Sequence, residues 1–165
     1  MPLDSVLRYE MTLDELTDFG MHEMTDTEVE GFLSSQSMGT LGLPTDAEPY
    51  LIPMSYGYDE GSRLYFYFVG SRGSRKMELA DQAETAAFLV YSAETAFNWE
   101  SVGLTGTIRK LPEDRSGDLD ETAVPTWRPE LFETASESLE TQTYEFEIEA
   151  WTGIRHTGLP PGFYG

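Results

Sequence analysis

Residues 71–76 carry three cations in six positions, and this spacing suits the binding of an anion. They read Ser-Arg-Gly-Ser-Arg-Lys in a chain that otherwise has few basic residues. They follow residues 64–69, an apolar run typical of a strand, and they lead into a helical segment at residues 76–80, for which Ser74 is a suitable N-cap. Because the first turn of a helix has free N–H groups and a partial positive charge, this arrangement predicts a phosphate site.

The two glycines of this region fit the same interpretation. Gly70 and Gly73 lack a side chain, so the backbone could approach a phosphate closely. The stretch is not a Walker loop, because the GxxxxGK[S/T] spacing is absent. The alternative is a solvated turn whose Arg and Lys only balance neighbouring acids, and the residues by themselves leave both interpretations open.

The charge of the chain argues against some classes of partner. Its 165 residues include 10 Lys and Arg against 30 Asp and Glu, a formal net charge of −20, with lysine only at Lys76 and Lys110. Binding to nucleic acid or to an acidic membrane surface relies on cations, so neither is expected. Acids spread this evenly, with Arg kept and Lys scarce, are typical of adaptation to molar salt, where charges are screened over about 3 Å. An acidic mimic of nucleic acid is the alternative.

The sequence offers little for nucleophilic or metal chemistry. It has no cysteine, and therefore no disulfide, thiolate nucleophile or thiolate metal ligand. His22 and His156 stand alone, without a cluster of ligands at metal spacing, so no metal site is predicted. Residues 1–16 lack the apolar core of a signal peptide, and no apolar run approaches the roughly 20 residues of a membrane helix. A cytoplasmic protein is expected.

The order of elements predicts a mainly β fold. Thr25 and Glu28 have the spacing of a capping box, so a helix should begin there. We expect an N-terminal arm (residues 1–24), one barrel domain (residues 25–157) and a turn-rich tail (residues 158–165). The domain should be a six-stranded antiparallel split β-barrel with a few flanking helices, one of them at residues 129–139 after an acidic connection. The strands are predicted at residues 37–43, 50–58, 63–69, 85–91, 99–110 and 144–151.

Two of these strands carry informative alternation. In residues 64–69 both alternating sets are apolar or aromatic, so both faces of the strand need cover. In the last strand an apolar set alternates with an acidic set, which predicts a half-buried strand whose acidic face lies in solvent. The apolar set is Tyr144, Phe146, Ile148 and Ala150, and the acidic set is Glu145, Glu147 and Glu149.

Five short motifs follow one another along the chain. They are Met-Gly-Thr-Leu at residues 38–41, Pro-Tyr-Leu-Ile-Pro-Met-Ser-Tyr-Gly-Tyr-Asp at 49–59, Leu-Tyr-Phe-Tyr at 64–67, Gly-Ser-Arg-Lys-Met-Glu-Leu at 73–79 and Trp-Glu-Ser-Val-Gly-Leu-Thr-Gly at 99–106. This ordered set resembles the FMN-binding split β-barrel family that includes pyridoxamine 5′-phosphate oxidase. The similarity covers residues 25–111 and is weaker in the last strand. Together with the acidic composition, it looks like a halophilic, haloarchaeal-type member of that family.

The resemblance implies a cofactor site built from three segments. Arg75 and Lys76 would grip the phosphate of FMN, with help from the hydroxyl or the N–H group of Ser74. Phe66 and Tyr67 would close the side of the site opposite the segment that runs along the isoalloxazine ring. That segment comprises Leu51, Ile52, Pro53, Met54, Ser55 and Tyr56, whose backbone N–H and C=O groups would meet the polar edge of the ring.

The resemblance also implies a homodimer and a redox function. Ser101 would come from the second subunit, so that FMN lies at the interface. The expected function is a flavin-dependent oxidoreductase acting on a small-molecule substrate, since the flavin carries the hydride or electron transfer and no acid–base pair is required. The alternatives are a deazaflavin-dependent reductase, the use of FAD, and a non-catalytic module that binds flavin or haem.

Two departures from the family pattern argue against pyridoxamine 5′-phosphate as the substrate. The oxidase itself carries a basic residue at the position where Tyr56 stands. It also ends in an Arg-containing strand that holds the phosphate of the vitamin, whereas residues 158–165 of this chain contain no cation. The identity of the substrate is therefore left open by the sequence.

Overall fold

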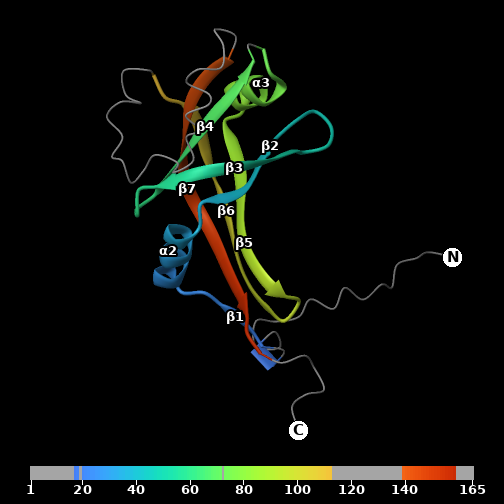
Figure 1. Ribbon diagram of the computed structural model, residues 1–165, viewed down its shortest axis with the longest axis vertical. Helices are drawn as coiled ribbons and strands as arrows, with labels where there is room; N and C mark the ends of the chain where they lie inside the picture. Colours follow the sequence, from blue (N-terminus) through green and yellow to red (C-terminus); the bar gives the residue numbers. More distant parts are fainter. Residues whose placement is uncertain (1–16, 19, 72, 113–138, 159–165) are drawn as a thin grey trace, which may run out of the picture.

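Six long strands close an antiparallel barrel, and helices α2 and α3 and a short strand lie against it (Figure 1). The computed structural model describes residues 17–18, 20–71, 73–112 and 139–158. This confirms the predicted mainly β, six-stranded antiparallel fold. In chain order the elements are β1 (Met21–Glu23), α2 (Asp26–Ser35), β2 (Met38–Leu43), β3 (Tyr50–Tyr58), β4 (Arg63–Ser71), α3 (Arg75–Gln82), β5 (Thr85–Thr95), β6 (Asn98–Lys110) and β7 (Leu139–His156).

Strand β7 holds the barrel together. The strands follow the order β1-β7-β4-β3-β2-β5-β6, and an additional pairing of β7 with β6 closes the ring. The contact between β3 and β4 is short: Tyr56, Gly57 and Tyr58 pair with β4, whereas all six residues of β2 pair with β3. The first six residues of β3 therefore pair with β2 alone, and β3 separates from β4 along this stretch. In Figure 1, α3 follows the end of β4 at the top of the barrel. Strand β1 lies at the bottom, where it pairs with the last residues of β7.

The alternation predicted for the third strand is present in β4. Leu64, Phe66 and Phe68 face the barrel interior and have no exposed surface. The ring of Phe66 lies 4.8 Å from that of Phe88 and 5.9 Å from that of Phe146, measured between centroids. The core is therefore built from aromatic rings contributed by strands on several sides of the barrel.

Helix α2 begins where the capping-box spacing predicts it. Thr25 is the N-cap, and its hydroxyl oxygen accepts a hydrogen bond of 3.3 Å from the backbone N–H of Glu28. The buried face of the helix comprises Val29, Phe32 and Leu33. The hydroxyl of Tyr56 on β3 donates a buried hydrogen bond of 2.7 Å to the carbonyl oxygen of Leu33. This bond joins the end of α2 to the barrel.

The last strand differs from its prediction in length and in phase. Leu139 begins β7, so it is not the end of a helix, and residues 129–138 of that predicted helix lie outside the described residues. The pairing with β6 shifts where Thr105 faces Ala150 and Gly106 faces Ile148, which leaves an extra residue, Glu149, on β7. Such a β-bulge reverses the alternation beyond it. Ala150 is accordingly exposed, and its predicted inward orientation is wrong.

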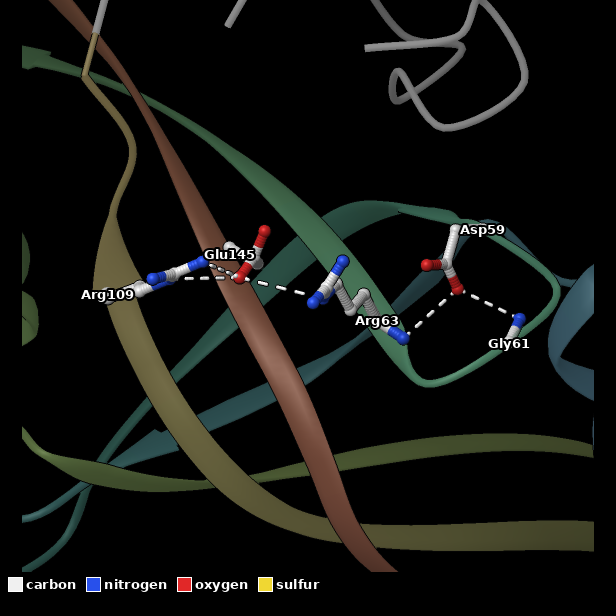
Figure 2. A network of polar contacts seen from close by, with 5 residues as sticks. All are labelled: Asp59, Gly61, Arg63, Arg109 and Glu145. Carbon is white, nitrogen blue, oxygen red and sulfur yellow. Dashed lines mark hydrogen bonds and ion pairs between the residues drawn. The ribbon is translucent and has the colours of Figure 1, made fainter. Parts of the chain in front are cut away.

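The predicted solvent exposure of the acidic face is also wrong at Glu145. This side chain lies on β7 between β4 and β6, and the residue is only 5% exposed. Its Oε1 accepts hydrogen bonds of 2.9 Å from Nε and 2.6 Å from Nη2 of Arg109, and Nε of Arg63 lies 3.7 Å away (Figure 2). Arg63 is held in turn at its backbone N–H by Asp59. Two arginines on neighbouring strands thus compensate a carboxylate that the alternation placed in solvent.

We expect Glu145→Gln to lower the free energy of unfolding by about 1–3 kcal/mol, since charge-assisted hydrogen bonds are lost and two arginines lose their counter-charge. The Arg63 and Arg109 side chains are 43% and 60% exposed, so the loss of stability should be smaller than for a fully buried ion pair. The matched control is Glu149→Gln, an exposed acid at the bulge of β7. Denaturant unfolding at fixed salt measures both. Equal effects of the two variants would contradict a structural role for Glu145.

Candidate functional site

The first turn of α3 contains a buried hydroxyl group, that of Ser74. Ser74 is the N-cap residue, as predicted, and its carbonyl oxygen accepts hydrogen bonds of 3.1 Å from the N–H groups of Met77 and Glu78. Its side chain makes no capping bond, and its Oγ is buried without a hydrogen-bond partner among the described residues. A buried polar atom without a partner costs free energy, so a ligand oxygen at this place would satisfy it.

Lys76 lies on the side of this turn that faces β4. Its Nζ donates a hydrogen bond of 2.5 Å to the carbonyl oxygen of Val69, near the end of β4. A Cβ atom added to Gly70 would lie 3.1 Å from Cε of Lys76 and 3.2 Å from Oγ of Ser74. A side chain at this position would therefore crowd both groups. Glycine at position 70 therefore lets the ammonium group of Lys76 and the hydroxyl of Ser74 lie close to the end of β4.

Arg75 lies on another side of the same turn. Its side chain is exposed, and its Cζ lies 5.8 Å from the centroid of the Tyr50 ring at the start of β3. We call Ser74, Arg75 and Lys76 together the α3 turn. Since the first N–H groups of a helix have no intrahelical acceptor, the α3 turn combines free amides with two cations and a hydroxyl. Arg72, the remaining cation of the predicted cluster, lies outside the described residues.

The predicted ring-binding segment is divided between the two faces of β3. Ile52, Met54 and Tyr56 face the barrel interior, where burial and nearby Tyr58 raise the pKa of Tyr56 far above its ordinary value. The outward residues are Leu51, Pro53 and Ser55, in register with β2. Residues 50–55 have no strand partner on the side toward β4 among the described strands. In an antiparallel ladder, alternate backbone groups point to each neighbour, so the N–H and C=O groups on one edge of this stretch have no ladder partner within the described ranges.

The structure separates the other predicted residues in the same way. Phe66 is fully buried in the core, so its ring is not available to a ligand outside the barrel. Its neighbour Tyr67 lies on the opposite face of β4 and is half-buried. Ser101 on β6 pairs with Tyr91 of β5 and is also half-buried on the outer side. Some of the predicted side chains thus lie outside the barrel interior. They are the α3 turn, Tyr67, Ser101 and the outward residues Leu51, Pro53 and Ser55.

One outer face of the barrel carries no charge at all. Thr40 pairs with Pro53 on one side and with Leu89 on the other, and Leu89 pairs with Gly103, so four strands form one surface. We call this surface the outer face. None of its positions carries a charged residue, although the chain has 30 Asp and Glu. Its members are Met38, Thr40 and Gly42 on β2, Leu51, Pro53 and Ser55 on β3, Ala87, Leu89 and Tyr91 on β5, and Ser101, Gly103 and Thr105 on β6.

Large apolar side chains are exposed on this face. Met38, Leu51, Leu89 and Tyr91 are 54%, 68%, 41% and 62% exposed, and they are all of the large exposed apolar side chains in the described part of the chain. Three of them were not predicted as functional. The signal was present in residues 86–91, where both alternating sets are apolar or aromatic, as in the third predicted strand. Exposed apolar patches are typical of interaction surfaces in soluble proteins.

The two histidines lie at the same end of the barrel, where β1 pairs with β7. Nδ1 of His156 lies 2.5 Å from the carbonyl oxygen of Phe97, and its ring stacks on that of Trp99. His22 lies on β1 and pairs with Arg155. Within the described ranges, no group of three or more His, Asp and Glu side chains is arranged to hold a metal ion. None of the helices that the structure describes is long and apolar enough to cross a membrane.

Solved structures with the same fold include several flavoproteins. An FAD-binding protein from Mesorhizobium loti has a TM-score of 0.61 at 18% identity, over 84% of this chain and 98% of that one. The FAD binding protein from Mycobacterium smegmatis has a TM-score of 0.62 at 16% identity, over 83% and 99%. The FAD and heme binding protein from the same organism has a TM-score of 0.58 at 20% identity, over 86% and 75%. At these identities the likeness concerns the fold.

The sequence itself matches one protein family. No curated protein matches it significantly. The sequence profile described as pyridoxamine 5′-phosphate oxidase, in contrast, matches residues 25–155, which span the barrel from the N-cap of α2 almost to the end of β7. With the closed antiparallel barrel of six strands, this match shows that the chain belongs to the pyridoxamine 5′-phosphate oxidase family of split-barrel proteins.

Proposed function

We propose that the protein is a homodimeric flavin-dependent oxidoreductase that binds the phosphate of FMN at the α3 turn. The observation that carries the proposal is the buried Oγ of Ser74, which has no hydrogen-bond partner in the part of the chain that the structure describes and lies near Lys76 at the start of α3. Phosphate oxygens would satisfy this hydroxyl and the free amides of Arg75 and Lys76. Both cations would add charge-assisted bonds. FAD-binding proteins are among the solved structures of this fold, which supports the flavin part of the proposal.

The free edge of β3 would position the ring. Residues 50–55 have backbone donors and acceptors without a strand partner toward β4, and the polar edge of an isoalloxazine needs such partners. Leu51 and Pro53 would contact the ring from the outer side. When bound, the flavin supplies the transfer of hydride or electrons, and the protein supplies orientation and exclusion of water. The substrate that gives or takes the electrons is a small molecule of undetermined identity.

The outer face would be the dimer interface. An uncharged apolar surface on a chain of net charge −20 is suited to a second copy of itself, because two such surfaces can meet without bringing carboxylates together. The same face carries Leu51, Pro53 and Ser55 of the ring-binding segment and Ser101 of β6. A flavin lying against this part of β3 would therefore sit between the subunits.

We expect Leu89→Glu to convert the dimer into a monomer, since it places a carboxylate at the centre of the outer face, between Thr40 and Gly103. Burying an unpaired charge in an interface costs several kcal/mol, enough to weaken dimerisation by about a thousandfold. Sedimentation at molar salt measures the state. The control is Ser62→Glu in the exposed β3–β4 turn, which adds the same charge away from this face. A Leu89→Glu protein that stays dimeric would place the interface elsewhere.

The first experiment is the absorption spectrum of the protein purified in high salt, with mass analysis of any small molecule released by heat. A flavin spectrum with a released flavin supports the proposal, and the mass separates FMN, FAD and a deazaflavin. Bleaching of the flavin band by a nicotinamide donor would support turnover. A colourless protein that also fails to take up added FMN would reduce the α3 turn to a solvated surface turn.

A further inference from the structure

A pocket of about 440 Å³ lies between the β2–β3 turn and one face of α3. This size is within the range of small-molecule sites. The helix contributes residues that are three or four positions apart and therefore share a face, among them Arg75, Glu78 and Leu79. The turn contributes the opposite wall, including Pro44 and Asp46. Most of the lining residues are exposed, so a ligand can enter directly from solvent.

The pocket contains charges of both signs that do not neutralise one another. Arg75 carries a guanidinium, and Asp46 and Glu78 carry carboxylates. Arg75 and Glu78 are three positions apart on α3, a spacing at which opposite charges can pair. Within the described part of the chain, however, no ion pair joins any two of these three groups. The Arg75 guanidinium lies over the ring of Tyr50 instead. The pocket therefore presents one cation and two anions to a ligand.

The wall that carries Asp46 is held in place by its own turn. The hydroxyl of Thr45 donates a hydrogen bond of 2.6 Å to the carbonyl oxygen of Glu48 and accepts one of 3.0 Å from the N–H of Ala47. On the helix side, Leu79 is half-buried and packs against the barrel core. A ligand would thus meet a fixed charged turn on one side and a fixed apolar side chain on the other, which lowers the ordering cost of binding.

We propose that this pocket binds a free α-amino acid with an apolar side chain. The guanidinium of Arg75 pairs with the carboxylate of the amino acid, for which its planar fork is suited. The carboxylates of Glu78 and Asp46 accept hydrogen bonds from its ammonium group. Its side chain lies against Leu79 and Pro44. This site goes beyond the proposed function and does not depend on it.

A ligand with both charges fits this lining better than a ligand of one sign. An anion such as phosphate would meet two carboxylates near its partner, and a simple cation would meet the guanidinium. The net charge of −20 attracts cations at low salt, but screening over about 3 Å removes this long-range attraction in molar salt. Direct contacts then decide, and an amino acid satisfies all three charged groups at once.

Arg75 belongs both to this pocket and to the α3 turn. If the proposed phosphate site is correct, a flavin phosphate and the carboxylate of the amino acid use the same guanidinium. FMN should then weaken the binding of the amino acid, and the amino acid should weaken FMN by the same factor, because coupling between two sites is reciprocal. This coupling is the part of the inference that rests on the proposed function.

The test titrates the flavin-free full chain in molar KCl with leucine, alanine and phenylalanine, each up to about 10 mM, by calorimetry. Two analogues of leucine serve as probes: isopentylamine lacks the carboxylate, and 4-methylpentanoate lacks the ammonium group. We expect leucine to bind at least about tenfold more tightly than either analogue, since each analogue leaves a charged group of the pocket without its partner. Absence of binding by all three amino acids overturns the inference, and so does equal affinity for leucine and either analogue.

A matched pair of double variants assigns the binding to this pocket. Asp46→Asn with Glu78→Gln should weaken leucine at least about tenfold. The control, Glu48→Gln with Glu84→Gln, changes the net charge by the same amount at exposed positions that do not line the pocket, and it should leave the affinity unchanged. Equal effects of the two double variants would overturn the site. A protein that binds FMN but no amino acid would also overturn it and leave the proposed function intact.

Discussion

Replacing Arg75 and Lys76 together with alanine should weaken FMN binding by about two to four orders of magnitude. Each residue is expected to make a charge-assisted bond to phosphate, and such bonds contribute about 1.5–3 kcal/mol each, while about 1.4 kcal/mol corresponds to a factor of ten. The loss of FMN affinity should exceed any loss of folding stability, because Arg75 is exposed. Within the described part of the chain, the side chain of Lys76 bonds to the end of β4. Fluorescence titration at fixed salt measures the affinity.

Two further variants make this experiment specific. Lys110→Ala removes the other lysine, exposed at the end of β6, and should leave FMN affinity unchanged. Ser74→Ala should weaken FMN binding by about tenfold or more, yet leave the apo protein equally or more stable, since it removes a buried hydroxyl that has no partner among the residues described. A double variant of Arg75 and Lys76 that keeps its flavin would disprove the phosphate site. A Ser74→Ala protein with weakened folding and normal affinity would assign that hydroxyl a structural role.

The second large effect is expected from salt. A chain with 30 acids and 10 Lys and Arg repels itself, and the range of this repulsion falls from about 10 Å at 0.1 M to about 3 Å at 1 M salt. We propose that the protein is adapted to high salt. Its Tm should rise by about 10 °C or more between 0.1 M and 2 M KCl, which corresponds to about 3 kcal/mol or more for a domain of this size.

Screening can be distinguished from a general salting-out effect. Screening acts mainly at low ionic strength, where the Debye length changes most, whereas salts that are excluded from the surface act increasingly at high concentration. Thermal unfolding in KCl and in sucrose should therefore differ, with a steep rise only in KCl below about 1 M. A melting temperature that does not depend on KCl would contradict adaptation to high salt.

Strand β7 shows where the alternation of residues along a strand fails to predict which side chains are exposed. An alternating set of glutamates predicts a solvated face, and this holds for Glu147, which is exposed. It fails for Glu145, because strand pairing brings Arg63 and Arg109 to it from both sides. It fails again beyond Glu149, where a bulge changes the phase. Neither the neighbours of a strand nor its bulges are encoded in its own alternation.

The candidate site also has features that the sequence could predict and features that it could not. The α3 turn was predictable, because an N-cap, two glycines and adjacent cations are local features that act within a few residues. Which of residues 51–56 face outward also follows from alternation once one orientation is known. The free edge of β3 and the unpaired hydroxyl of Ser74 could not be predicted, because both depend on where β4 and α3 lie in space.

The sequence by itself determined the mainly β fold, the start of α2 and α3, the cluster of cations and the acidic charge. These are properties of composition, of short-range hydrogen bonding and of apolar periodicity, which act along the chain. Only the tertiary structure decided that an uncharged outer face exists, that Phe66 and Tyr56 belong to the core, and that Arg75 borders a pocket. These depend on contacts between residues far apart in sequence, since strand register and barrel closure determine which side of each strand meets solvent.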